Sequence, residues 1–158
     1  MCIRDSFYTG EGFDFEKPKA ALKEKGFSVY RWLNAPPSPE ELEKSLKKAN
    51  QLWLISHSDR RLSDAHIAVI KKFFDAGHGV YIWGDNEPYY GDANALGKAL
   101  LGVTMLGNVM GDQVVGRKEA GMKSGLIPGL LLTTGLENIY EGITIATIQP
   151  KMCIRDRR

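Results

Sequence analysis

The feature that most constrains the fold of this chain is an alternation of short, largely apolar runs with segments of helical periodicity. Two of the runs, 51–56 and 79–83, have the length and composition of strands that are buried on both faces of a sheet. Between them apolar residues recur at intervals of three and four, as at Ile67, Ile70 and Phe74, which is the spacing of an amphipathic helix. Strands that alternate with helices through short connections favour a parallel sheet. The sequence therefore predicts an α/β fold, a three-layer sandwich around a mostly parallel, doubly wound sheet.

Cap and turn residues divide the chain into elements. Ser38, Pro39 and Glu41 have the pattern of a helix start, with a serine cap, a proline at the first helical position and a glutamate three residues after the serine. The predicted helix caps are Asp14, Ser38, Ser63 and Asp92. Their helices are expected to end near Lys25, Lys48, Gly77 and Leu101. In the first helix, Phe15, Leu22 and the paired alanines at 20–21 are expected to face inward. The expected strands are 7–8, 27–33, 51–56, 79–83, 113–115 and 142–148, and the expected late turns are 107–111 and 133–135.

The two ends of the chain repeat one hexapeptide. Residues 1–6 and 152–157 differ only in their last position, and the peptide resembles the translation of a transposase adapter used in sequencing. The sixth codon of that adapter begins with AG, which encodes only serine or arginine, and these are the two residues found. We therefore expect 1–6 and 151–158 to be adapter-derived and exclude them from fold prediction. On this interpretation 7–150 is one α/β domain whose first strand is truncated to Phe7-Tyr8.

Leaving out the two ends changes what the composition implies. Both cysteines, Cys2 and Cys153, fall in them, so the segment 7–150 has no cysteine and gives no information on redox compartment. The net charge changes from +2 for the whole chain to −1 for the segment, which has 16 basic and 17 acidic residues, so no nucleic-acid partner is predicted. No stretch reaches the roughly 18 apolar residues that a membrane helix needs. Localisation and any membrane association of the full protein stay open.

Several strand ends and glycine turns of the chain carry a family resemblance. They are Leu-Trp-Leu-Ile-Ser-His at 52–57, the neighbouring segments 73–79 and 80–86, and the late segments 131–136 and 140–146. In these stretches the chain resembles the class I glutamine amidotransferase-like superfamily, in particular its ThuA-like and related uncharacterised branches. The resemblance implies a flavodoxin-like or amidotransferase-like sandwich.

The resemblance also bears on catalysis. Amidotransferases place a cysteine nucleophile on the sharp turn after the strand that corresponds to 79–83, and a His-Glu pair follows later in their sequence. Here that turn is Trp83-Gly84-Asp85, and the segment 7–150 has no cysteine and no histidine after His78. Because nucleophilic catalysis needs a nucleophile with a base within hydrogen-bond reach, glutaminase activity is not expected. Whether the domain has another enzymatic activity stays open.

Three loops, 9–12, 56–60 and 84–92, should meet at the carboxyl edge of the predicted sheet, where open parallel sheets bind ligands. Their carboxylates, amides and aromatic rings suit a polyhydroxylated ligand, because rings stack on the apolar face of a sugar while carboxylates accept its hydroxyl protons. The candidate ligand-binding residues are Gly10, Glu11, His57, Ser58, Trp83, Asp85, Asn86, Glu87, Tyr89 and Tyr90. The same oxygens could hold Ca²⁺ or Mg²⁺, and the simplest alternative is an ordinary structural turn. No metal site, cofactor or catalytic residue is predicted.

The leading hypothesis is a non-catalytic amidotransferase-like module that binds a small polar ligand, for instance a carbohydrate, or a protein partner such as another domain of the full-length chain. The preserved scaffold and the missing nucleophile favour it. The alternative is a hydrolase or sugar-processing enzyme that uses His57 with Asp85 or Glu87 as acid and base. A receiver-like signalling domain is a third class, but Glu11 and Asp59 match its acidic positions poorly.

Overall fold

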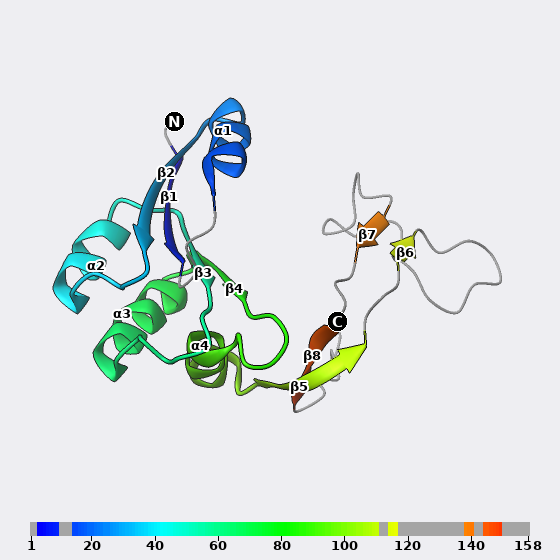
Figure 1. The fold of residues 1–158 in the computed structure, drawn as a ribbon. Coiled ribbons are helices and arrows are strands. Elements are labelled where there is room, and N and C mark those ends of the chain that lie inside the picture. Colours follow the sequence, from blue (N-terminus) through cyan, green and yellow to red (C-terminus); the bar gives the residue numbers. More distant parts are fainter. Residues whose placement is uncertain (1–2, 10–13, 111–113, 117–137, 141–143, 150–158) are drawn as a thin grey trace, which may run out of the picture.

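The computed structural model describes residues 3–9, 14–110, 114–116, 138–140 and 144–149, and over them the chain is a mixed α/β protein (Figure 1). Its main sheet has four strands in the order β2-β1-β3-β4, and each neighbouring pair is parallel. These strands are β1 (Ile3–Thr9), β2 (Phe27–Leu33), β3 (Gln51–Ile55) and β4 (Gly79–Trp83). The helices are α1 (Glu16–Glu24), α2 (Pro39–Leu46), α3 (Asp64–Asp75) and α4 (Gly91–Leu101). The antiparallel pairs are β5 (Thr104–Met110) with β8 (Thr144–Gln149), and β6 (Val114–Gly116) with β7 (Asn138–Tyr140).

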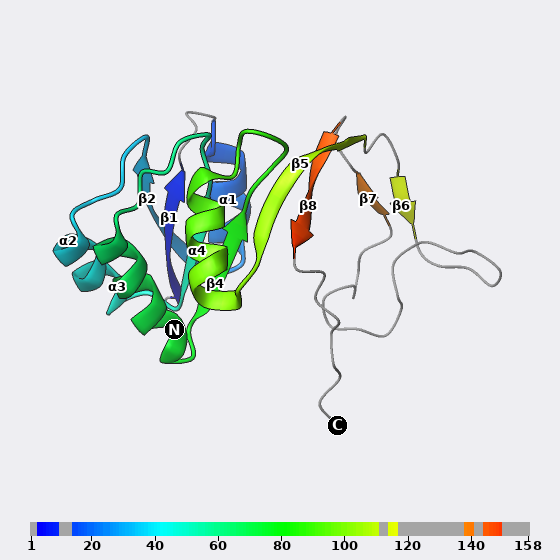
Figure 2. The same cartoon turned by 90° about the horizontal axis from the view of Figure 1, so that it is seen from below.

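Helices lie on both faces of the main sheet. Figure 2 shows α1 on one side and α2, α3 and α4 on the other. The strand order accounts for the sides of α1, α2 and α3, because the chain moves in one direction from β1 to β2 and in the opposite direction from β2 to β3 and β4, and crossovers between parallel strands are generally right-handed. The predicted α/β class and the parallel sheet are therefore confirmed.

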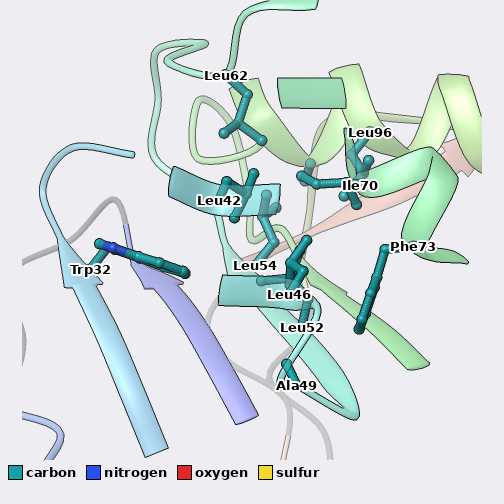
Figure 3. Close-up of a cluster of buried hydrophobic side chains, with 11 residues drawn as sticks. Trp32, Leu42, Leu46, Ala49, Leu52, Leu54, Leu62, Ile70, Phe73 and Leu96 are labelled. Carbon is teal, nitrogen blue, oxygen red and sulfur yellow. The ribbon is translucent and has the colours of Figure 1, made fainter. Parts of the chain in front are cut away.

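Strand β3 shows how the sequence supplies two cores. Successive side chains of a strand point to opposite faces. Leu52 and Leu54 are buried in the larger cluster, with side chains from α2, α3 and α4 (Figure 3). Ile55 packs with Phe15 in the smaller cluster on the α1 side, and Trp53 packs against it. A strand that is apolar at consecutive positions is thus buried from both sides.

Strand β1 is longer than predicted. It begins at Ile3, inside the repeated terminal peptide, and its seven residues pair with β2 while Asp5–Thr9 also pair with β3. The predicted strand, Phe7-Tyr8, was too short. The residues before Phe7 are also part of the strand, because their backbone pairs with β2 and, from Asp5 on, with β3. The prediction that residues 1–6 are encoded by an adapter is a statement about the DNA sequence, so the strand does not test it and it stays a prediction.

Two of the predicted caps are confirmed. Ser38 Oγ accepts a hydrogen bond from Glu41 N (3.2 Å) at the start of α2. Ser63 Oγ accepts one from His66 N (3.4 Å) at the start of α3, and His66 Nδ1 accepts one in return from Ser63 N (3.1 Å). This reciprocal pair is a capping box in which histidine stands where glutamate is usual.

The predictions for α1 and α4 need correction. The N-cap of α1 is Phe15, although the Asp14 carboxylate accepts from Glu16 N (2.9 Å) and so still serves the first turn. The alanines at 20–21 are exposed, because the side of the sheet that α1 covers carries only one helix over the described residues. The N-cap of α4 is Tyr90, and Asp92 lies within the first turn with another role.

The late strands were predicted in part. The expected strands at 113–115 and 142–148 correspond to β6 and β8 within two residues at each end. The segment 107–110 was expected to be a turn, but it belongs to β5. Gly107, at φ +64°, coincides with a register irregularity between Leu106 and Val109 where β5 pairs with β8, which explains why a glycine stands inside a strand. The expected turn at 133–135 lies outside the described residues.

Candidate functional site

Two of the three predicted loops are brought together at the carboxyl ends of β3 and β4. Ser56 N donates to Trp83 O (2.8 Å), which extends the pairing of the two strands by one residue. Gly91 N donates to His57 O (2.9 Å) and links the loop after β3 to the start of α4. The third loop contains Gly10 and Glu11, and these two candidate residues lie outside the described part of the chain.

The side chain of Ser56 caps α4 from a distant part of the sequence. Asp92 N and Ala93 N both donate to Ser56 Oγ at 3.1 Å. These two amides are among those at a helix start that have no acceptor within the helix. Ser56 is buried, and its hydroxyl lies 3.1 Å from His57 O as donor. The loop after β3 therefore fixes the position of the helix that follows β4.

Asp92 forms the reciprocal link. Its side chain is fully buried, at 0% exposed, and Oδ1 accepts hydrogen bonds from Arg61 N (2.8 Å) and Leu62 N (2.7 Å). The other oxygen, Oδ2, has no hydrogen-bond partner among the described residues. Ser56 and Asp92 thus join the same two segments in opposite directions, with one side chain from each segment bonding to the backbone of the other.

Gly91 allows the two segments to approach each other closely. A Cβ atom at this position would lie 2.6 Å from both Ser58 O and the carbonyl carbon of Asp59. Distances this short between a Cβ and backbone atoms do not occur without a backbone shift. Glycine is therefore required here by contact, while its φ is an ordinary one.

The loop from Gly84 to Tyr90 is held by its own backbone and by β5. Asp85 N donates to Tyr89 O (3.0 Å), and Tyr89 N donates to Asn86 O (2.7 Å). Two further bonds come from β5: the Asn108 side chain accepts from Glu87 N (2.8 Å), and Gly107 N donates to the Tyr90 hydroxyl (3.2 Å). Strand β5 was not predicted, so this support for the loop was not predicted either.

The candidate residues of this loop differ in exposure. Asp85 and Glu87 are exposed, and Tyr89 is 42% exposed. Asn86 is half-buried, and Tyr90 packs against the main core. The Asp85 carboxylate accepts from Asn86 N (2.8 Å), which orients it within the turn. Asp85, Glu87 and Tyr89 are therefore the side chains of this loop that a ligand in solvent could reach.

Trp83 and His57 have different surroundings. Trp83 is the register partner of Ile55, which places it on the α1 side of the sheet, where it is 47% exposed. The Nδ1 atom of His57 lies 2.9 Å from Ser58 Oγ and accepts from Asp59 N (3.3 Å). Because a backbone N–H points at Nδ1, we place the ring proton of neutral His57 on Nε2. These partners are neighbours in sequence, so they add no support to the enzyme alternative with Asp85 or Glu87, which stays a prediction.

The structural roles of Ser56 and Asn94 at this edge were not predicted, and Asp92 was predicted to cap its own helix rather than to hold the loop after β3. The Asn94 side chain holds the backbone of Met105, accepting from its N and donating to its O (2.9 Å), and so fixes the start of β5 against α4. The sequence does show polar residues next to apolar segments here. It does not show which backbone groups they bind, because these groups lie 11 to 37 residues away in sequence.

Over the described residues no group of three or more His, Cys, Asp or Glu side chains is arranged to hold a metal ion. Within the same residues, none of the helices has the length and apolar character needed to cross a membrane. One groove, between α2 and α3, lies away from the candidate loops, and a second groove, lined by residues of β4, α4, β5 and β8, lies next to Gly84.

Comparison of the chain with family models, curated proteins and solved structures found no match. The amidotransferase-like assignment is therefore a proposal that depends on the residues and the geometry above.

Proposed function

We propose that this chain is a non-catalytic amidotransferase-like domain that binds a small polar ligand at the carboxyl edge of its main sheet. The observation that carries the proposal is the double link between Ser56 and the start of α4 and between Asp92 and the backbone of Arg61 and Leu62. It holds two loops together as one surface at the edge where open α/β sheets bind their ligands. Rigid presentation of polar groups reduces the entropy that binding costs.

The strand order supports the finer description of the fold. The order β2-β1-β3-β4 with parallel pairs has its change of direction between β1 and β3. Helices on both faces add the other layers of a doubly wound, flavodoxin-like sandwich. We infer this architecture from the four strands and four helices of the main sheet, and it agrees with the amidotransferase-like resemblance of the sequence.

The exposed side chains support a polyhydroxylated ligand such as a carbohydrate. Asp85 and Glu87 are exposed acceptors, and Tyr89 offers an aromatic ring to the same solvent. Carboxylates accept bonds from hydroxyl groups, and an aromatic face covers the apolar face of a sugar ring. Since the catalytic cysteine of amidotransferases has no counterpart here, binding without glutaminase chemistry is the simplest function of this edge.

A second candidate is a protein partner on the α1 side of the sheet, favoured by a separate observation. Tyr81 is 50% exposed and contacts Trp53, with their ring centroids 4.9 Å apart, and the neighbouring Trp83 is also exposed. Parallel sheets normally have both faces covered. Exposed aromatic side chains of this kind are enriched at protein interfaces.

The ligand proposal is tested by thermal unfolding in the presence of a panel of monosaccharides, disaccharides and polyols. At least one of them should raise the melting temperature in a saturable manner, because a ligand that binds only the folded state stabilises it. Asp85→Asn and Tyr89→Ala should each abolish the rise, while Asp75→Asn, which changes an exposed carboxylate on α3, should preserve it. A panel without any effect, or a rise that survives both site variants, would refute ligand binding at this edge.

A further inference from the structure

A groove between α2 and α3 lies at the edge of the main sheet opposite to the candidate loops. It adjoins the C-terminal end of α3 and the start of β4, whereas the loops follow the end of β4. Its lining consists of Glu43, Leu46, Lys47, Val69, Lys72, Phe73, Ala76 and His78, and its volume is about 150 Å³.

The floor of the groove is apolar and partly aromatic. Leu46 and Phe73 are buried members of the main core (Figure 3), and Val69 packs against them. The His78 ring stacks on the Phe73 ring, with centroids 4.3 Å apart and planes 7° from parallel. A flat ring inserted here would meet apolar side chains and the Phe73–His78 pair.

The rim of the groove has an excess of positive charge. Lys72 Nζ forms an ion pair with Glu43 Oε1 at 2.8 Å, which satisfies one lysine with the one acidic residue of the lining. The hydrogen bond from Lys72 and the charges of Lys72 and Lys47 lower the pKa of Glu43. With two lysines and one glutamate in the lining, one positive charge remains for an anion.

We propose that this groove binds a small aromatic carboxylate, with its ring against Leu46, Val69 and Phe73 and its carboxylate beside Lys47. The size of the groove suits one ring, since an internal cavity of about 150 Å³ in another protein binds benzene. Larger organic ligands generally occupy pockets of about 300–1,000 Å³, so we expect this groove to bind only a small molecule. A carboxylate on that molecule pairs with an ammonium in a charge-assisted hydrogen bond. This site is independent of the ligand proposed for the carboxyl edge of the sheet.

The test is a titration of the whole chain with sodium phenylacetate, followed by the backbone amide shifts of the groove residues. We expect saturable shifts at Leu46, Val69 and Phe73, with a dissociation constant in the low millimolar range, about 1–10 mM. Benzyl alcohol, which has the same ring without the charge, should bind at least five-fold more weakly. Lys47→Met should weaken phenylacetate binding by about five-fold, while Lys48→Met, which removes the adjacent charge outside the lining, should leave it unchanged.

Each alternative result overturns the proposal. An absence of saturable shifts at these residues up to roughly 20 mM phenylacetate would show that the groove does not bind this class of ligand. Equal binding of phenylacetate and benzyl alcohol, or equal effects of Lys47→Met and Lys48→Met, would show that the lysine on the rim does not recognise the carboxylate. Because both lysines are exposed, the two variants should fold as the original chain does.

Discussion

Replacing Asp92 by alanine tests the link between the loop after β3 and the helix after β4. The change removes the acceptor of two backbone hydrogen bonds, from Arg61 N and Leu62 N. A hydrogen bond to a carboxylate contributes roughly 1.5–3 kcal/mol, so the two together contribute about 3–6 kcal/mol. The change also removes the buried Oδ2, which has no hydrogen-bond partner among the described residues, so part of this contribution is recovered. The free energy of unfolding should therefore fall by about 3 kcal/mol, the lower end of that range.

The assay is urea denaturation at neutral pH, together with thermal unfolding. For a chain of this size the expected loss lowers the melting temperature by roughly 6–12 °C. Asp92→Asn, which keeps one acceptor oxygen and nearly the same volume, should cost about half as much. Asp75→Ala is the control, because it removes an exposed carboxylate in an ion pair with Lys71, where a change of less than about 1 kcal/mol is expected. If Asp92→Ala costs no more than this control, the link does not stabilise the fold as argued.

Three further predictions concern single contacts of the same region and of α3. Gly91→Ala should lower the melting temperature by several degrees, because its Cβ would lie 2.6 Å from Ser58 O; an unchanged midpoint would contradict this close approach. Ser56→Ala should cost about 1 kcal/mol and speed amide hydrogen exchange in the first turn of α4, as loss of a cap does; unchanged exchange there would show that Oγ is not the cap. His66→Ala should cost about 1–2 kcal/mol in urea denaturation, because it removes both the acceptor of Ser63 N and the Nε2 atom that lies 2.7 Å from Pro37 O. His66→Gln should cost less, because glutamine can still accept from Ser63 N; equal losses would argue against the capping box.

The elements that the sequence predicted well are those with a local signal. Strands β3 and β4 were predicted within one residue, because runs such as Leu52–Ile55 are apolar at consecutive positions and are bounded by polar residues or glycine. Helices α2 and α3 were predicted with their serine caps, since a cap acts on an amide three residues away. The meeting of the loops after β3 and β4 followed from a general property of parallel sheets, whose strands end at a common edge.

The elements that were missed depend on distant neighbours. The sequence 107–111 has a glycine at each end, which is typical of a turn. Residues up to Met110 nevertheless belong to β5, which pairs with β8 through a register irregularity next to Gly107. Strand β1 starts earlier than its apolar residues suggest, because β2 and β3 provide partners for the backbone of Ile3–Ser6. Backbone pairing of this kind depends on which strands lie side by side and is only weakly encoded in the strand itself.

By itself the sequence determined the α/β class, the parallel sheet and the edge at which the polar loops gather, because periodicity and caps act over a few residues. The tertiary structure alone decided how that edge is held together. Asp92 was expected to cap its own helix, but its oxygen accepts from amides 30 and 31 residues earlier, and Ser56 caps a helix that begins 35 residues later. A buried polar atom bonds to whatever donor or acceptor the packing of distant segments brings to it, and no local pattern specifies that partner.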